Sequence, residues 1–153
     1  MNTTNISSFN IIGISVRTSN ENGQAAKDIP VLWGKLMGEN LIPTIPNVTD
    51  ANIHCIYTDY EGDHNKPYTV LLGMKVSSLE NIPEGMSGMS FSGGDYQTYH
   101  EEGNLEEGLV YNAWMKIWNE PIDRAYTADI EVYDASKPDP KNTAVDIHIA
   151  LKS

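Results

Sequence analysis

The sequence predicts an α+β fold in which two β-α-β-β units form one antiparallel sheet with two helices on one face. Several segments alternate apolar and polar residues, which is typical of strands, and two others carry apolar residues at helical spacing. These segments follow one another in the order β-α-β-β, twice. Because each helix has one apolar stripe to bury, both helices are expected to pack on the same side of the sheet.

The first unit opens with residues 9–18, whose apolar side chains fall on alternate positions as in a half-buried strand. Asp28 is the predicted N-cap of a helix whose apolar residues recur every three or four positions. Pro30 then lies in the first turn of this helix, where a missing N–H is harmless. Residues 52–60 and 68–76 predict two strands joined by a turn-rich segment.

The second unit repeats this order. Residues 86–98 predict one or two short strands interrupted by glycines, and Asn104 with Glu107 forms a predicted capping pair for the next helix. Residues 127–133 and 144–152 alternate as two further strands, with a proline-containing loop between them. The second half of the chain therefore also predicts β-α-β-β.

The two predicted helices share a short local pattern. The segment LWGKL at residues 32–36 corresponds to AWMKI at residues 113–117, and a pair of strands follows each. This correspondence favours an internal duplication, which places the groove between the two helices on a pseudo-symmetry axis. A concave, mostly apolar groove of this kind is a common place for a small-molecule site.

Composition and charge restrict the class of protein and of partner. With 153 residues, 40% of them hydrophobic, the chain is expected to form one domain over residues 1–153, with residues 1–8 as a flexible N-terminal segment. The net charge of −11 opposes contact with phosphate backbones and anionic lipids, so neither a nucleic acid nor a membrane is an expected partner. Cys55 is the only cysteine, so no intramolecular disulfide is possible. Without a recognisable signal peptide or membrane span, the expected location is cytoplasmic.

Aromatic residues are concentrated on the elements that border the predicted groove. Any single one of them is also typical of an ordinary core, but their number on these elements favours a binding pocket. The candidate pocket aromatics are Trp33, Tyr57, Tyr96, Trp114 and Trp118.

Glu131 is the candidate charged residue of this pocket. Strand alternation places it on the same face as Asp129 and Tyr133, opposite Ile130 and Val132. If that face meets water, Glu131 is an ordinary solvated residue. If it meets the helices, burial raises the pKa of the carboxyl group, and the carboxylate needs a positively charged partner.

Four motifs occur in order along the chain: Gly13-x-Ser15-x-Arg17-Thr18, Ile29-x-x-Leu32-Trp33, Tyr57-x-x-Tyr60-Glu61 and Asp129-Ile130-Glu131-x-Tyr133. By their order and spacing, the chain resembles the GyrI-like family from about residue 9 to residue 151. The resemblance implies a duplicated, GyrI-like or SOUL-like fold. This fold serves as the effector-binding domain of AraC-type, multidrug-responsive transcription regulators, and it also occurs alone, including on mobile gene cassettes.

The resemblance also implies a ligand and a role for one residue. In drug-binding members of the family, a glutamate of the late strand pairs with lipophilic cations, and that role carries over to Glu131. Regulators of this family carry a helix-turn-helix module for which this chain has no room. We therefore expect it to bind a small organic cation and to act through a separate regulatory protein, if it acts in regulation.

The leading hypothesis is ligand sensing or sequestration, without catalytic residues, cofactor or metal. Two alternatives belong to other classes of function. In the first, the pocket carboxylate acts as a general base in the hydrolysis of reactive small molecules, as the resemblance to some GyrI-like proteins implies. In the second, an exposed aromatic surface binds a partner protein.

Overall fold

The strands of both predicted units join into one curled sheet. The computed structural model of the protein describes residues 3–63 and 65–152. Within these residues, eight strands lie side by side in the order β1-β6-β8-β7-β3-β4-β2-β5, and all paired neighbours are antiparallel. The elements are β1 (Thr3–Ile6), β2 (Phe9–Thr18), η1 (Glu21–Gly23), α1 (Gln24–Gly38), η2 (Ile42–Thr44), β3 (Val48–Thr58), β4 (Tyr68–Val76), β5 (Ser87–Phe91), β6 (Gly94–Gly103), η3 (Leu105–Glu107), α2 (Leu109–Trp118), β7 (Ala128–Tyr133) and β8 (Thr143–Ala150).

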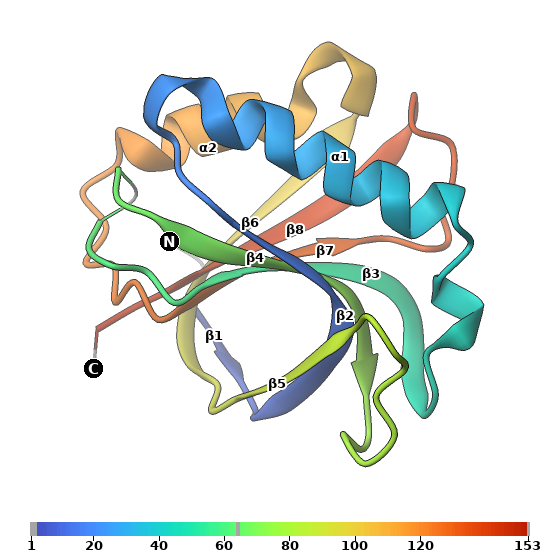
Figure 1. The fold of residues 1–153 in the computed structure, drawn as a ribbon. Coiled ribbons are helices and arrows are strands. Elements are labelled where there is room, and N and C mark those ends of the chain that lie inside the picture. Colours follow the sequence, from blue (N-terminus) through green and yellow to red (C-terminus); the bar gives the residue numbers. More distant parts are fainter. Residues whose placement is uncertain (1–2, 64, 153) are drawn as a thin grey trace.

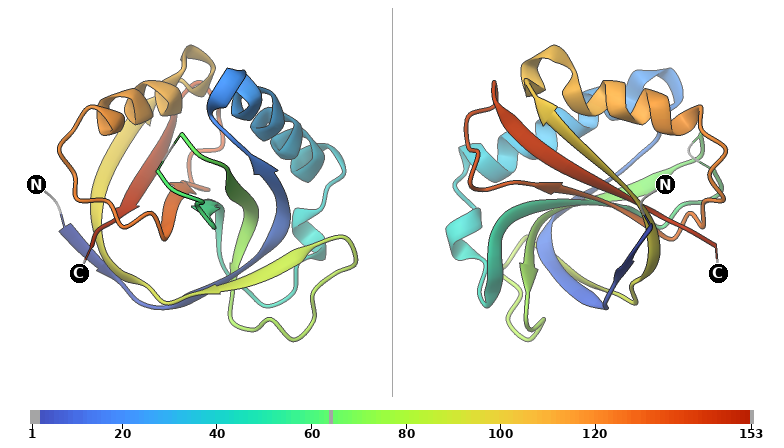
Figure 2. Two further views of the ribbon diagram at one scale, coloured as in Figure 1. Left: turned by 60° about the vertical axis from the view of Figure 1, so that its left-hand side comes forward. Right: turned by 180° about the vertical axis from the view of Figure 1, so that it is seen from behind.

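Helices α1 and α2 cover the same face of the sheet (Figures 1 and 2). This arrangement confirms the predicted α+β fold with two β-α-β-β units, β2-α1-β3-β4 and β6-α2-β7-β8. The two units meet where β3 pairs with β7, at the centre of the sheet. None of the helices in the described residues combines the length and hydropathy needed to cross a lipid bilayer.

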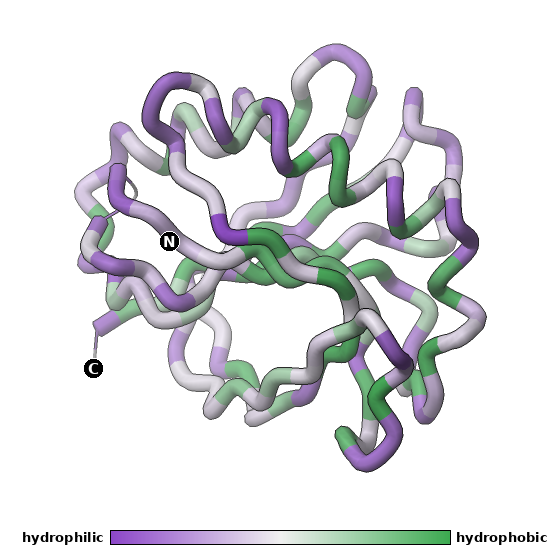
Figure 3. Tube along the Cα trace, viewed as in Figure 1, coloured by the Kyte–Doolittle hydropathy of each residue, from purple (hydrophilic) through white to green (hydrophobic). Residues whose placement is uncertain are grey.

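The face of the sheet away from the helices curls around a hydrophobic core of its own. Figure 3 shows hydrophobic residues along the middle of the strands and hydrophilic residues at many of the surrounding loops. In this core the rings of Phe9 and Phe91 stack with centroids 5.0 Å apart, against Ile11 and Ile130. The curled core is therefore separate from the space between the sheet and the helices.

The N-terminal segment contains a strand that the sequence does not predict. Thr3–Ile6 form β1, which pairs with β6 so that Thr4 lies opposite Tyr96. We expected residues 1–8 to be flexible, because apart from Met1 and Ile6 their side chains are polar and follow no strand pattern. Backbone pairing with the sheet edge needs no such pattern. Residues 1 and 2 lie outside the described part of the chain.

Helix α1 begins one turn before the predicted N-cap. It starts at Gln24, so that Pro30 lies inside the helix. Asp28 does not cap the helix. Its carboxylate accepts a hydrogen bond from the Thr18 hydroxyl at 2.8 Å, which ties the helix to β2. The earlier start buries Ala25, one heptad before the buried Leu32, so the apolar stripe continues past the proline.

The start of α2 also differs from the prediction. The Asn104 side chain caps the short 3₁₀ turn η3 by accepting a hydrogen bond from the backbone N–H of Glu106, not of Glu107. Gly108 then takes a left-handed conformation with φ of 81°, and the α-helix begins at Leu109. The capping asparagine is therefore used, but for the turn that precedes the helix.

Candidate ligand-binding site

The pairing of β3 with β7 sets the geometry of the site. Cys55 lies opposite Glu131 in this pair. Tyr57 lies two residues after Cys55 on β3, and Tyr133 lies two residues after Glu131 on β7. Because the two strands run in opposite directions, the tyrosines lie on opposite sides of the Cys55–Glu131 pair. Residues two apart on a strand share a face. The duplicated fold thereby brings a tyrosine from each unit to one carboxylate.

Glu131 is almost completely buried, with 1% of its surface exposed. Its Oε2 accepts hydrogen bonds from the Tyr57 hydroxyl at 2.8 Å and from the Trp114 indole N–H at 2.6 Å. Its Oε1 accepts one from the Tyr133 hydroxyl at 2.6 Å. Among residues 3–63 and 65–152, no lysine, arginine or histidine forms an ion pair with this carboxylate.

Burial controls the protonation of this cluster. It raises the pKa of Glu131 above the usual value of a glutamate, although the hydrogen bonds that the carboxylate accepts oppose the shift. Burial, with the nearby Cys55 and Glu131, also raises the pKa of Tyr57 well above its usual value. The pKa of Tyr133 rises for the same reasons, with burial first. Both phenols therefore remain protonated at neutral pH and continue to donate to the carboxylate.

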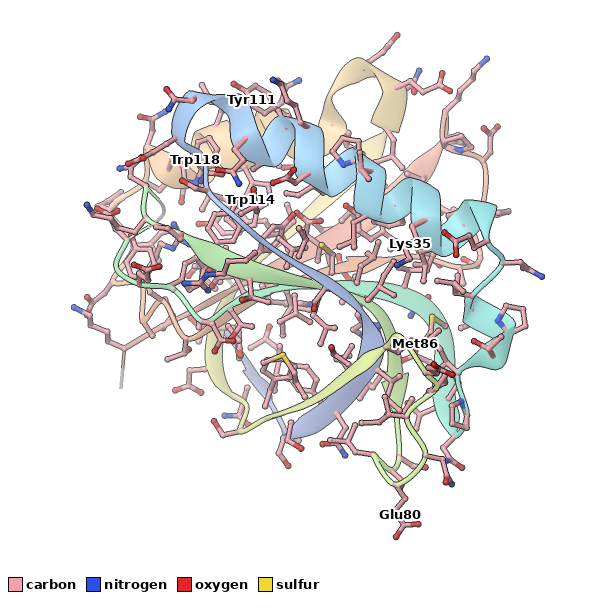
Figure 4. The ribbon with its side chains drawn as sticks, in the orientation of Figure 1. Lys35, Glu80, Met86, Tyr111, Trp114 and Trp118 are labelled. Atoms are coloured by element: carbon pink, nitrogen blue, oxygen red, sulfur yellow. The ribbon has the colours of Figure 1, made fainter. Side chains whose placement is uncertain are left out.

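A cavity of about 880 Å³ lies over Glu131, between the sheet and the helices. Trp33 on α1 makes a T-shaped contact with Tyr133, with ring centroids 4.8 Å apart, and Trp114 on α2 makes one with Tyr57 at 5.4 Å. Figure 4 shows Trp114 between the helix layer and the sheet, whereas Tyr111 lies farther from the sheet, at the exposed rim of the cavity. Each helix thus supplies one tryptophan that supports the tyrosine of a central strand.

Five of the six residues predicted for the pocket border this cavity, and Tyr96 does not. Tyr96 is 3% exposed and belongs to the hydrophobic core on the opposite face of the sheet, near the His148 ring. Its position on β6, opposite Ala150, turns it away from the helices. Tyr96 is therefore withdrawn as a pocket residue. The five that border the cavity are Trp33, Tyr57, Trp114, Trp118 and Glu131.

The cavity wall also contains residues that the sequence prediction did not include. Tyr133 carries a signal in the sequence, because it lies two positions after Glu131 on a strand. Tyr60 also carries one, because it belongs to the motif Tyr57-x-x-Tyr60-Glu61. Tyr68 and Arg124 carry none that distinguishes them, since Tyr68 begins a strand and Arg124 lies outside the strands. The additional aromatic and charged wall residues are Tyr60, Tyr68, Tyr111, Arg124 and Tyr133.

Comparison with known proteins gives a family and several relatives that each match nearly the whole chain. Residues 4–151 match the model of the Cass2 family, described as integron-associated effector binding protein. An integron cassette protein from the mobile metagenome of Vibrio cholerae is 29% identical and has a TM-score of 0.77, with 99% of this chain and 95% of that chain covered. YobU of Bacillus subtilis (strain 168), whose name proposes a role in transcriptional regulation, is 26% identical over 92% of this chain and 90% of its own length. The solved structure of SAV2435 bound to tetraphenylphosphonium has the same fold, with a TM-score of 0.76 and 14% identity over 99% of this chain and 93% of that chain.

Proposed function

Because this chain belongs to the Cass2 family of integron-associated effector-binding proteins, we propose that it binds a lipophilic organic cation in the cavity beneath its helices. Glu131 is the counter-ion in this proposal, and the aromatic side chains supply the contact surface. One observation carries it: a carboxylate with 1% exposure accepts three hydrogen bonds and has no ion-pair partner among the described residues.

The energetics of a buried carboxylate favour a cationic ligand. Removing an ionised carboxylate from water is costly, and hydrogen bonds compensate for part of that cost. A cation beside Glu131 compensates for more of it, and each good contact between a cation and an aromatic face contributes about 0.5–2 kcal/mol. The net charge of −11 also attracts cations to the molecule from a distance.

The ligand of SAV2435 indicates which probe compounds to use. Tetraphenylphosphonium has a positive centre surrounded by phenyl rings and no hydrogen-bond donor. Such an ion can bind only through its charge and its rings. A cavity with tryptophan and tyrosine walls and one carboxylate supplies both kinds of contact.

The test is a comparison of methyltriphenylphosphonium with triphenylphosphine oxide, which has nearly the same shape but no net charge. We expect the cation to quench tryptophan fluorescence in a saturable manner, because Trp33, Trp114 and Trp118 border the cavity. The neutral compound is expected to bind at least about tenfold more weakly. Equal affinities for the two compounds would contradict the role of Glu131 as counter-ion.

Binding of the cation is also expected to depend on pH. Burial raises the pKa of Glu131, so the free protein holds a proton there at a pH at which an exposed glutamate is already ionised. The ligand binds the ionised form, so its affinity falls as the pH is lowered through this raised pKa, by up to about tenfold per pH unit. Isothermal titration calorimetry between about pH 8 and pH 5 measures this dependence, and the permanent charge of the phosphonium excludes titration of the ligand. A flat profile over this range would contradict the prediction.

No specific observation favours hydrolysis at this site. Both oxygens of Glu131 accept hydrogen bonds from protein donors, two at Oε2 and one at Oε1, so only Oε1 has a remaining lone pair for a water molecule on which the carboxylate could act as a general base. A binding protein returns its ligand unchanged. Chromatography of the ligand after prolonged incubation therefore distinguishes the two functions.

A further inference from the structure

Arg124 is a second charged residue in the wall of the cavity. It lies between α2 and β7, and its side chain is 6% exposed. The backbone around it is held in place, because Arg124 forms a bridge with Leu151 and the N–H of Ala125 donates to the carbonyl of Ala150 at 2.8 Å. The guanidinium is thus a fixed part of the wall.

Asp129 balances the charge of Arg124. Nη2 of Arg124 donates to Oδ2 of Asp129 at 2.8 Å, and Asp129 has no exposed surface. The same Oδ2 accepts a hydrogen bond from the Tyr60 hydroxyl at 2.6 Å, while Oδ1 accepts one from the backbone N–H of Ala150 at 2.9 Å. Asp129 is not among the residues that line the cavity, so the described residues contribute two charged groups to its wall, Arg124 and Glu131.

The guanidinium also completes a closed circuit of aromatic contacts. Its central carbon lies 4.3 Å from the ring centroid of Tyr126 and 5.8 Å from that of Trp114. Arg124 therefore occupies a cation–π position between Trp114 and Tyr126 in the aromatic wall. The remaining contacts of the circuit are Trp114–Tyr57 at 5.4 Å, Tyr57–Tyr68 at 5.9 Å, Tyr68–Tyr60 at 5.6 Å and Tyr60–Tyr126 at 5.6 Å.

The donors of Arg124 are not all used by the protein. Its Nε is buried and has no hydrogen-bond partner among the described residues. A guanidinium has five N–H donors, and one of those of Arg124 bonds to Asp129. Because Arg124 lines the cavity, the group has capacity to donate to an acceptor from a ligand there.

Trp114 links the two charged groups that face the cavity. Its indole N–H donates to Glu131, and its ring contacts the guanidinium of Arg124. One ligand of drug size can therefore contact both groups in a cavity of about 880 Å³. Its positive centre is expected beside Glu131, and its other end beside Arg124.

We propose that Arg124 determines the specificity of this pocket, by selecting cations that carry an anionic or hydrogen-bond-accepting group away from the positive centre and by disfavouring dications. This inference rests on the proposed binding of organic cations. The guanidinium attracts an acceptor and repels a second positive charge. The net charge of −11 acts in the opposite direction, since alone it favours a dication over a zwitterion.

The test uses three probes with one triphenylphosphonium group and different tails: (4-carboxybutyl)-, pentyl- and (4-aminobutyl)triphenylphosphonium. At pH 7.5 the first is a zwitterion, the second a monocation and the third a dication. We expect the affinity to decrease in this order, with about tenfold or more between the zwitterion and the dication at about 0.15 M salt. Arg124→Gln is expected to abolish or reverse this order, because the variant leaves Asp129 without its counter-ion, and circular dichroism verifies that the variant is folded.

The outcomes separate this inference from the function on which it rests. If none of the three phosphonium ions binds the wild-type protein, the proposed function is overturned and this inference with it. If all three bind with equal affinity, or the dication binds most tightly, the role of Arg124 alone is overturned. The order of affinities in the wild type decides this even if Arg124→Gln fails to fold.

Discussion

Glu131→Gln is expected to weaken the binding of methyltriphenylphosphonium about 30-fold or more, which corresponds to the loss of one buried charge pairing. The change removes the charge and leaves the shape of the side chain. Binding of the neutral triphenylphosphine oxide is expected to change less than about threefold. Fluorescence titration of both compounds against both proteins measures the two effects. An equal loss for the two compounds would mean that the variant changes the shape of the pocket and not its charge.

Glutamine fits the hydrogen-bond donors around this position. Its carbonyl oxygen can accept from Tyr57 and Trp114 in place of Oε2. Its amide can donate to Tyr133, because a phenolic hydroxyl can turn and accept. The cavity is therefore expected to keep its walls in the variant.

The stability of Glu131→Gln provides an independent check. Burial raises the pKa of Glu131 in the folded state above its pKa in the unfolded chain. The folded protein therefore loses stability as the pH rises through the interval between these two pKa values. The full cost of the buried charge is present at a pH above the folded-state pKa. Glutamine does not carry that cost, so we expect thermal unfolding of the variant at pH 7.5 at or above the wild-type temperature.

Glu80→Gln is the matched control for the charge. It changes the net charge by the same amount, but Glu80 is exposed and lies at the end of the molecule remote from the helices (Figure 4). We expect its affinity for the cation to stay within about twofold of the wild type. A loss as large as that of Glu131→Gln would indicate that only the overall charge of the protein matters.

Much of the fold could be predicted because its signals are local. Residues 68–76 are a mostly apolar run that follows a turn-rich segment, and they form β4 with the predicted bounds. The order and spacing of the four motifs indicated the GyrI-like family, and the match to an effector-binding family confirms this. The start of α1 was predicted wrongly. Proline is typical of the first turn of a helix, so Pro30 indicated a start at Asp28, but the helix begins at Gln24 and buries Ala25 in an additional turn.

The site was predicted in part, because contacts between distant segments have no local signal. Strand alternation placed Glu131 on a defined face, but which face meets the helices follows from the packing of α2 and from the position of Trp114. Tyr96 lies on a strand like Tyr57 does, and the pattern of alternation alone did not place it on the opposite face. Arg124 lies outside both helices and all eight strands, where no periodicity marks a wall residue.

One residue of the first motif has a structural role that the sequence alone does not reveal. Gly13 on β2 lies directly opposite Gly73 on β4. A Cβ atom added at Gly13 would lie 2.1 Å from the carbonyl oxygen of Leu72, and one added at Gly73 would lie 2.0 Å from that of Ile12. Both contacts are with the backbone, which cannot move aside as a flexible side chain can. The close approach of these two strands therefore requires glycine at both positions.

Gly13→Ala is accordingly expected to destabilise the protein by about 3 kcal/mol or more, at the upper end of the usual cost of overpacking. For a chain of this length, that lowers the midpoint of thermal unfolding by about 6–12 °C. Gly34→Ala on α1 is the matched control, because its Cβ would meet no atom within 4 Å. Since alanine favours a helix over glycine by about 0.5–1 kcal/mol, the control is expected to stabilise the protein slightly. If calorimetry gave the two variants the same midpoint, β2 and β4 would not approach as closely as the structure requires, and the curled sheet beneath the cavity would owe its shape to other contacts.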